Sequence, residues 1–388
     1  MNTKNLIIMS ILIVIGGQAA QLSAGGPGAA ACISLAQPVS AKSAGMNNAY
    51  SALSGDIVSL HYNPAGIARM TQHELSALYR RGFAEDTYAS LLCGFKFPDK
   101  KYALGASVLM YDSGTVDIYN PQGEKFSKIG QRDLTFTLGL AMPSFIENVN
   151  CGFSIKGISS EIFGNSASAV AGDFGLQYCN GYTLAASIHN IGSKINYLNR
   201  DESLPEIIRV GIMKNYDFEK YSLITAIDFP HYIQESETLT LVGLELNVQG
   251  LYYIRGGYKY NFAESSRDDE QSVTGGMGVQ FGNFSIDYAL GITDDLDIPH
   301  TVSLGLKFGA VSHIERGRDT YIQEDDADDV FFKRRTHKQI KEKDLKIYDE
   351  NGKRKQAPVR RIKRDSEAEN QETSPSKTTR HKRRFILE

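Results

Sequence analysis

The chain has 388 residues, of which 41% are hydrophobic and 22% charged, and its net charge is −3. This length suffices for a substantial core, and four cysteines are too few for a disulfide framework. Its 36 glycines, 20 tyrosines and 18 phenylalanines favour a β-rich protein. The mean hydropathy of −0.28 excludes a polytopic helical membrane protein, but not a membrane β-barrel with a polar lumen face.

Residues 1–24 have the pattern of a signal peptide. A lysine near the start precedes an apolar run at 6–15, and small residues follow the run. That run is too short to span a bilayer as a helix. Cleavage is expected after Ala19 or Ala24, with Ala31 as a further alternative and a lipoprotein beginning at Cys32 as another. The mature protein is therefore expected to be exported, either as a soluble protein or as a barrel.

Apolar and polar residues alternate along fourteen segments between residues 73 and 309. In one of them Leu134, Phe136 and Leu138 lie on one face, and the small or polar residues between them lie on the other. Segments of about ten residues with this period are typical of membrane barrels, since soluble strands are usually shorter. The predicted strands are 74–82, 87–97, 102–112, 132–142, 149–159, 168–178, 182–191, 207–216, 220–229, 238–248, 251–261, 272–281, 284–292 and 300–308.

Short and long connections alternate between these segments. The connections after even-numbered strands are short, and those after odd-numbered strands are mostly longer, notably 113–131, 192–206 and 262–271. This alternation is typical of outer-membrane barrels, which have short periplasmic turns and long outer loops. We therefore predict an all-β protein, a 14-stranded antiparallel transmembrane β-barrel at 73–309, located in the cell outer membrane. An even strand count would place both termini in the periplasm.

Several motifs resemble the PorV/PorQ branch of the FadL-type outer-membrane proteins. Before the barrel stand SAGMNNAYSALSGD (43–56) and YNPAGIARM (62–70). Eight further motifs follow in the family order: AGDFGLQY (171–178), AASIHNIG (185–192), LPEIIRVGI (204–212), LITAIDFP (223–230), VGLELNV (242–248), IRGGYKY (254–260), SIDYALG (285–291) and HTVSLGLKFG (300–309). The resemblance implies a 14-stranded barrel with an N-terminal hatch inside it, and a chain that ends near the last strand.

Residues 33–72 are the expected hatch, or plug, and contain the motif Asn63-Pro64-Ala65-Gly66. Two roles stay open for it: shaping a ligand path through the lumen, or only filling the lumen. Alternation also places nine charged residues on the lumen face: Lys156, Asp173, Arg209, Asp228, Glu245, Arg255, Lys259, Asp287 and Lys307. These charges either pair with one another and the hatch, or orient a substrate head group. Their mixed signs argue against a simple ion pore.

Residues 310–388 form a charged segment beyond the family pattern. Residues 311–388 hold 21 of the 42 basic and 16 of the 45 acidic residues, so this part is about +5. Sparse, aperiodic apolar residues predict a disordered periplasmic tail. The tail either remains unbound or contacts peptidoglycan, the anionic polymer within its reach. A nucleic-acid partner is not expected for an exported chain.

No catalytic motif, metal-ligand spacing or cofactor motif is present in the sequence, so we expect neither an enzyme nor a cofactor. The resemblance implies a barrel that binds or passes a hydrophobic small molecule. Its alternative implication is a component of a protein secretion system of type IX, or of a surface-attachment system, with secretion proteins as partners and no transport of its own. Outer-membrane lipid is the expected surrounding in both cases.

Overall fold

The computed structural model describes residues 30–82, 86–97, 100–120, 122–261, 272–292 and 298–309. The predicted signal peptide and the predicted tail lie outside these residues. Within the described part, no helix has the length and apolar character needed to cross a membrane.

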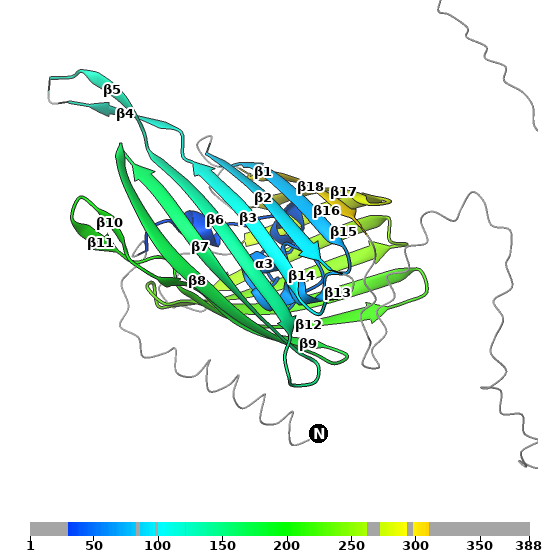
Figure 1. Ribbon diagram of the computed structural model, residues 1–388. Coiled ribbons are helices and arrows are strands. Elements are labelled where there is room, and N and C mark those ends of the chain that lie inside the picture. The colour runs from blue at the N-terminus through cyan, green and yellow to red at the C-terminus, as the bar shows by residue number, and fades with distance from the viewer. Residues whose placement is uncertain are drawn as a thin grey trace, which may run out of the picture. The chain divides into compact units, whose positions relative to one another are not determined.

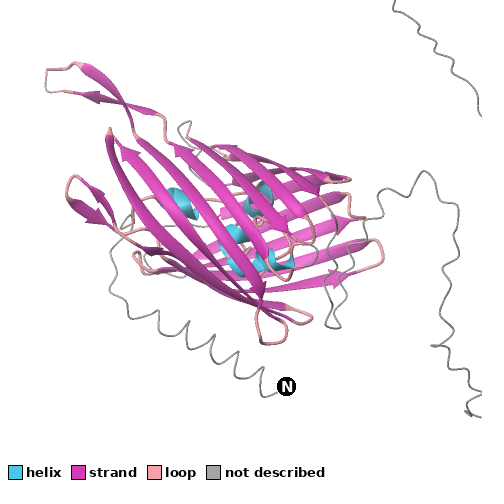
Figure 2. Cartoon of the chain, viewed as in Figure 1, coloured by secondary structure: helices cyan, strands magenta, loops and turns pink. Residues whose placement is uncertain are grey.

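Fourteen antiparallel strands form one closed barrel, and the first strand pairs with the last (Figures 1 and 2). The predicted strand number and topology are therefore confirmed, with most strand ends displaced by no more than one or two residues. The barrel strands are β1 (His73–Arg81), β2 (Thr87–Lys96), β3 (Ala103–Asp112), β6 (Gln131–Pro143), β7 (Val149–Ile162), β8 (Asn165–Cys179), β9 (Thr183–Gly192), β12 (Ile207–Asp217), β13 (Tyr221–Tyr232), β14 (Glu237–Val248), β15 (Tyr252–Asn261), β16 (Ser272–Phe281), β17 (Phe284–Ile292) and β18 (His300–Phe308).

Two of the predicted long loops contain hairpins that sequence analysis missed. One hairpin pairs β4 (Thr115–Tyr119) with β5 (Lys125–Ile129), and the other pairs β10 (Ile195–Tyr197) with β11 (Arg200–Glu202). In addition, β7 and β8 extend to a two-residue turn at Phe163-Gly164, where both residues have positive φ. This end of the barrel is called the long-loop end below, and the opposite end is called the short-turn end.

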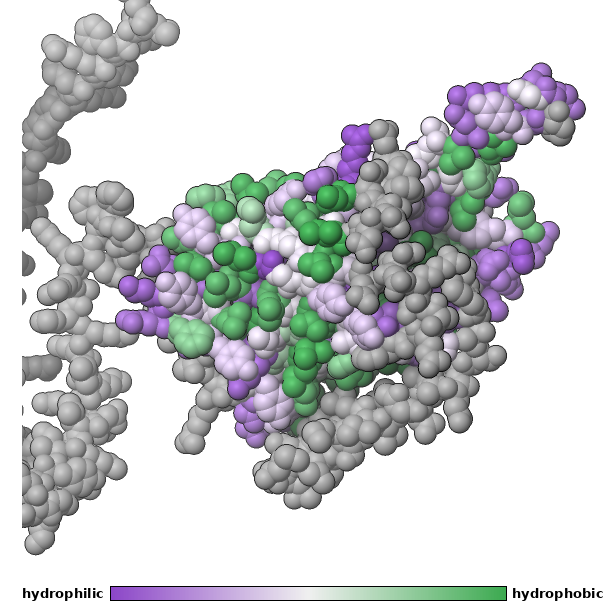
Figure 3. Space-filling model, turned by 180° about the vertical axis from the view of Figure 1, so that it is seen from behind, coloured by the Kyte–Doolittle hydropathy of each residue, from purple (hydrophilic) through white to green (hydrophobic). Residues whose placement is uncertain are grey.

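The barrel wall is apolar outside and polar inside. On β6, Phe136 and Leu138 are exposed on the outer face, whereas Thr135 and Thr137 are buried on the inner face. Figure 3 shows apolar side chains gathered over the outer wall and hydrophilic ones toward the ends. This polarity is the inverse of a soluble barrel and matches the lipid-facing and lumen-facing alternation of membrane barrels.

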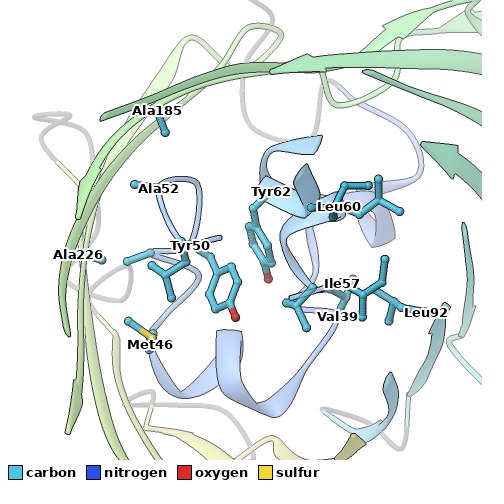
Figure 4. Packing of buried hydrophobic residues seen from close by; sticks show 14 of the residues in the cluster. Val39, Met46, Tyr50, Ala52, Ile57, Leu60, Tyr62, Leu92, Ala185 and Ala226 are labelled. Atoms are coloured by element: carbon cyan, nitrogen blue, oxygen red, sulfur yellow. The ribbon is translucent and has the colours of Figure 1, made fainter. Parts of the chain in front are cut away.

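The segment before β1 lies inside the barrel. It contains η2 (Ile33–Ala36), α2 (Ala41–Gly45), α3 (Ser59–Tyr62) and η3 (Pro64–Arg69). Figure 4 shows its side chains, including Tyr50 and Leu60, surrounded by wall residues such as Leu92 and Ala226. The main buried cluster is therefore formed between this segment and the inner wall. We call residues 30–72 the hatch.

The hatch runs through the lumen from one end of the barrel to the other. At the long-loop end, the Ala31 amide donates to the carbonyl of Ser203 over 2.9 Å. At the short-turn end, the hatch leads directly into β1, and Gly309 after β18 lies beside His73. The first described residues thus lie at the long-loop end, and the last described residues lie at the short-turn end.

Candidate functional site in the barrel lumen

The Asn63-Pro64-Ala65-Gly66 motif forms the start of η3 and its contact with the wall. Asn63 is fully buried, and its Oδ1 atom accepts a hydrogen bond from the Ala65 amide over 3.0 Å. Its Nδ2 atom donates to the carbonyl of Leu176 on β8, also over 3.0 Å. Pro64 suits the first position of the helix, where its missing amide hydrogen costs nothing. One asparagine thus caps the helix and joins the hatch to the wall.

Glycines in the wall make room for this motif. A Cβ atom on Gly175 would lie 2.0 Å from Asn63 Oδ1, and one on Gly152 would lie 2.4 Å from the carbonyl carbon of Pro64. Both distances are far below any tolerable contact. The hatch therefore approaches β7 and β8 so closely that only glycine fits at these two wall positions.

The structure places all nine predicted lumen charges on barrel strands, and seven of them are buried. Lys259 and Lys307 are only half-buried. The seven buried residues are Lys156, Asp173, Arg209, Asp228, Glu245, Arg255 and Asp287. A buried charge is costly unless it is paired and hydrogen-bonded, so the partners of each residue decide what it can do.

Lys156 and Asp173 form a buried ion pair on neighbouring strands. Their Nζ and Oδ2 atoms are 2.9 Å apart, and Ser154 and the Asn190 amide donate two further hydrogen bonds to the carboxylate. Lys156 also donates to the side-chain oxygen of Asn190 over 2.6 Å. Polar partners thus surround both charges.

His189 connects this pair to the hatch. Its Nε2 atom lies 2.8 Å from the carbonyl of Tyr62, and its Nδ1 atom lies 3.7 Å from Asp173 Oδ2. The wall is irregular here, because His189 and Asn190 of β9 together oppose Asp173 alone, and Asn190 has a left-handed φ of 61°. Alternation along one strand cannot show such a bulge, and sequence analysis therefore missed both residues.

A second buried group joins three predicted residues. Arg255 contacts Glu245 through Nε and Asp287 through Nη1, both at 2.6 Å. The two carboxylates lie on β14 and β17, on either side of the arginine strand β15 and its neighbour β16. This triad therefore links four consecutive strands of the wall.

Asp228 binds the hatch directly. Its carboxylate accepts hydrogen bonds from the amides of Tyr50 and Ser51, at 3.0 and 2.8 Å, and from the Ser51 hydroxyl at 2.5 Å. Gln177 adds to this anchor, because its side-chain amide donates to the carbonyls of Ser51 and Leu53. The hatch loop at 50–53 is thus held from two strands.

Among the nine predicted lumen charges, Arg209 is the one with a buried donor that has no hydrogen-bond partner in the described residues. Its guanidinium lies 5.4 Å from the ring centroid of Tyr62, in cation–π geometry. The Nη1 atom is buried and has no hydrogen-bond partner among the described residues. Arg209 thus combines an aromatic contact with a buried donor that has no partner among the described residues.

The hatch carries its own charged group. Lys42 Nζ lies 3.1 Å from Asp56 Oδ2, and the Tyr50 hydroxyl donates to the same carboxylate over 2.5 Å. Burial alone would raise the pKa of Asp56, but Lys42 and the Tyr50 hydroxyl hold it below its usual value. On the other side of the hatch, burial and the charge of Lys156 lower the pKa of His61 well below its usual value, so this ring is neutral.

Comparison with solved structures finds similar barrels at low sequence identity. The toluene transporter TbuX of Ralstonia pickettii matches with a TM-score of 0.51 and 13% identity, over 74% of this chain and 100% of that one. A FadL homologue from Pseudomonas aeruginosa matches with a TM-score of 0.50 and 12% identity, over 70% and 98% of the two chains. No family model and no curated protein matches the sequence. The likeness shows a shared barrel fold.

Proposed function

We propose that the protein is an outer-membrane β-barrel of the FadL-like superfamily that binds or passes a hydrophobic small molecule. The observation that carries the proposal is the combination of an apolar outer wall, a charged inner wall and a hatch folded in the lumen. A barrel of this polarity has its favourable surroundings in a lipid bilayer. The fold shared with a toluene transporter supports a hydrophobic ligand.

Arg209 is the residue that we assign to the ligand. Most other buried lumen charges have close partners, so they hold the wall and the hatch together. Arg209 has a free donor beside Tyr62, and it can bind a polar group of a ligand whose apolar part packs on the aromatic ring. The half-buried Lys259 and Lys307 are further candidates for such contacts.

Native mass spectrometry of the detergent-purified full chain tests this assignment. The wild-type protein is expected to carry a co-purified lipid-like molecule, and Arg209→Met is expected to lose it. Arg132→Met is the matched control, because Arg132 is exposed and pairs with Asp112 at the barrel rim. Proteoliposome uptake of radiolabelled palmitate and toluene provides a second measurement. Absence of a bound molecule together with absence of uptake of either probe would refute the proposed function.

The second candidate is a PorV-like component of a protein secretion or surface-attachment system. Polar contacts fix the hatch to the wall at Asn63, Tyr50, Ser51 and Tyr62. A hatch fixed in this way favours the second candidate, because a barrel without transport of its own does not need a movable plug. Purification from native membranes distinguishes the two. Stoichiometric secretion proteins and no small molecule would support this candidate.

A further inference from the structure

The hairpin of β4 and β5 extends beyond the barrel wall at the long-loop end (Figure 1). It is a separate two-stranded sheet that pairs with no other strand of the described chain. Isolated hairpins are at best marginally stable in water, and they leave two unpaired edges.

One face of the hairpin exposes three apolar side chains together with Lys128. Val116 and Ile118 of β4 lie beside Lys128 and Phe126 of β5, because Val116 pairs with Lys128 and Ile118 with Phe126. Val116, Ile118 and Phe126 are between 38% and 49% exposed. Side chains of this kind on a strand are usually buried against a core or a partner.

The two edges of the hairpin differ in charge. The β5 edge carries Lys125 and Lys128, and lysines on an edge strand discourage further pairing. The β4 edge has the sequence TVDIY, with high strand propensity and a single charge. That charge, Asp117, already binds Lys125 Nζ at 2.7 Å and accepts a hydrogen bond from the Ser127 hydroxyl at 2.7 Å. The β4 edge is therefore the open one.

The register identifies the free backbone groups of this edge. Asn120 donates to the carbonyl of Glu124, and Gly130 donates to that of Gly114. Hydrogen-bonded and non-hydrogen-bonded residue pairs alternate along antiparallel strands, so the amides of Val116 and Ile118 also point toward β5. The amides of Thr115, Asp117 and Tyr119 consequently point outward from the β4 edge.

We propose that the β4 edge binds an extended segment of a partner protein by strand addition. The partner would pair with the outward amides and place alternate apolar side chains beside Val116 and Ile118.

A second copy of this chain fits the edge less well than another protein. In the membrane location proposed above, copies are related by rotation about the membrane normal, so their hairpins extend in the same direction. Antiparallel pairing of this edge with its own copy requires hairpins that extend in opposite directions.

Fluorescence anisotropy on the full chain in nanodiscs tests the proposal with a labelled nine-residue peptide of alternating threonine and valine. Asp117→Pro removes one outward amide of the β4 edge, and Ser127→Pro makes the matched change directly opposite, on the β5 edge. We expect wild-type binding, at least tenfold weaker binding to Asp117→Pro, and a change below twofold for Ser127→Pro. Asp117→Asn controls for the lost charge and is expected to bind like wild type.

A change that leaves the backbone intact provides the second measurement. Ile118→Ser keeps the edge amides but removes an apolar side chain beside them, and we expect it to weaken binding several-fold. A peptide that is N-methylated at alternate residues should not bind, because it cannot pair with the edge. Absence of peptide binding to the wild type, or equal losses in Asp117→Pro and Ser127→Pro, would overturn the proposal. This result is independent of small-molecule uptake.

Discussion

Replacing Asp228 by alanine should release the hatch from the barrel wall. Its carboxylate is fully buried and accepts three hydrogen bonds from Tyr50 and Ser51. A hydrogen bond to a charged group contributes about 1.5–3 kcal/mol. In the Asp228→Ala variant, two backbone amides and one hydroxyl lose their acceptor and can hydrogen-bond only to water. Because lumen water can compensate in part, we expect hatch docking to weaken by about 3–5 kcal/mol. At 1.4 kcal/mol per factor of ten, the undocked population rises roughly 10²- to 4 × 10³-fold.

Single-channel recording in planar bilayers measures this population directly. The wild type is expected to stay mostly closed, and Asp228→Ala to show frequent openings of larger conductance. Asp287→Asn is the control, since Asp287 is a wall carboxylate that binds Arg255 and, within the described residues, has no hydrogen bond or ion pair with the hatch. Identical closed-state behaviour of Asp228→Ala and the wild type would refute the assignment of Asp228 as a hatch anchor.

Three further predictions concern the hatch and the tail. Deleting residues 33–72 should raise the single-channel conductance while the barrel still inserts; unchanged conductance would mean that something else closes the lumen. Gly175→Val should open the channel, because its side chain would collide with Asn63, whereas Gly157→Val should leave it closed, because a Cβ atom there meets open space. The full chain should bind purified peptidoglycan sacculi in a salt-sensitive way through the excess positive charge of 310–388, and truncation after Gly309 should abolish this binding.

The sequence predicted the barrel well because apolar and polar side chains alternate with a strict period of two along the strands. In a membrane barrel, a charge on the outer face is costly, so the apolar face of each strand indicates which side faces outward. The spacing of the turns indicates the number of strands. The lumen position of Asp228 and Glu245 was readable for the same reason. Their partners were not, since alternation places a side chain on a face but does not give the register between strands or the path of the hatch.

The features that sequence analysis missed have no such period to reveal them. The β4–β5 hairpin is exposed on both faces, so its polarity resembles that of an irregular loop. His189 and Asn190 lie at a bulge that depends on how β9 pairs with β8. The direction of the hatch depends on contacts such as that of Ala31 with Ser203, which lie far apart in the sequence.

A double-mutant cycle on Lys156 and Asp173 decides between the two roles left open for the lumen charges. Lys156→Met leaves a buried carboxylate without its cation, which should destabilise the barrel by about 3–5 kcal/mol. Lys156→Met combined with Asp173→Asn removes both charges, so it should recover most of that loss, with a coupling of roughly 3 kcal/mol in urea unfolding from liposomes. If the pair serves only the wall, the double variant keeps the co-purified ligand. Additive destabilisation would show that the two charges do not act as a pair. If the double variant regains its stability but loses the ligand, the two charges bind the head group of the substrate.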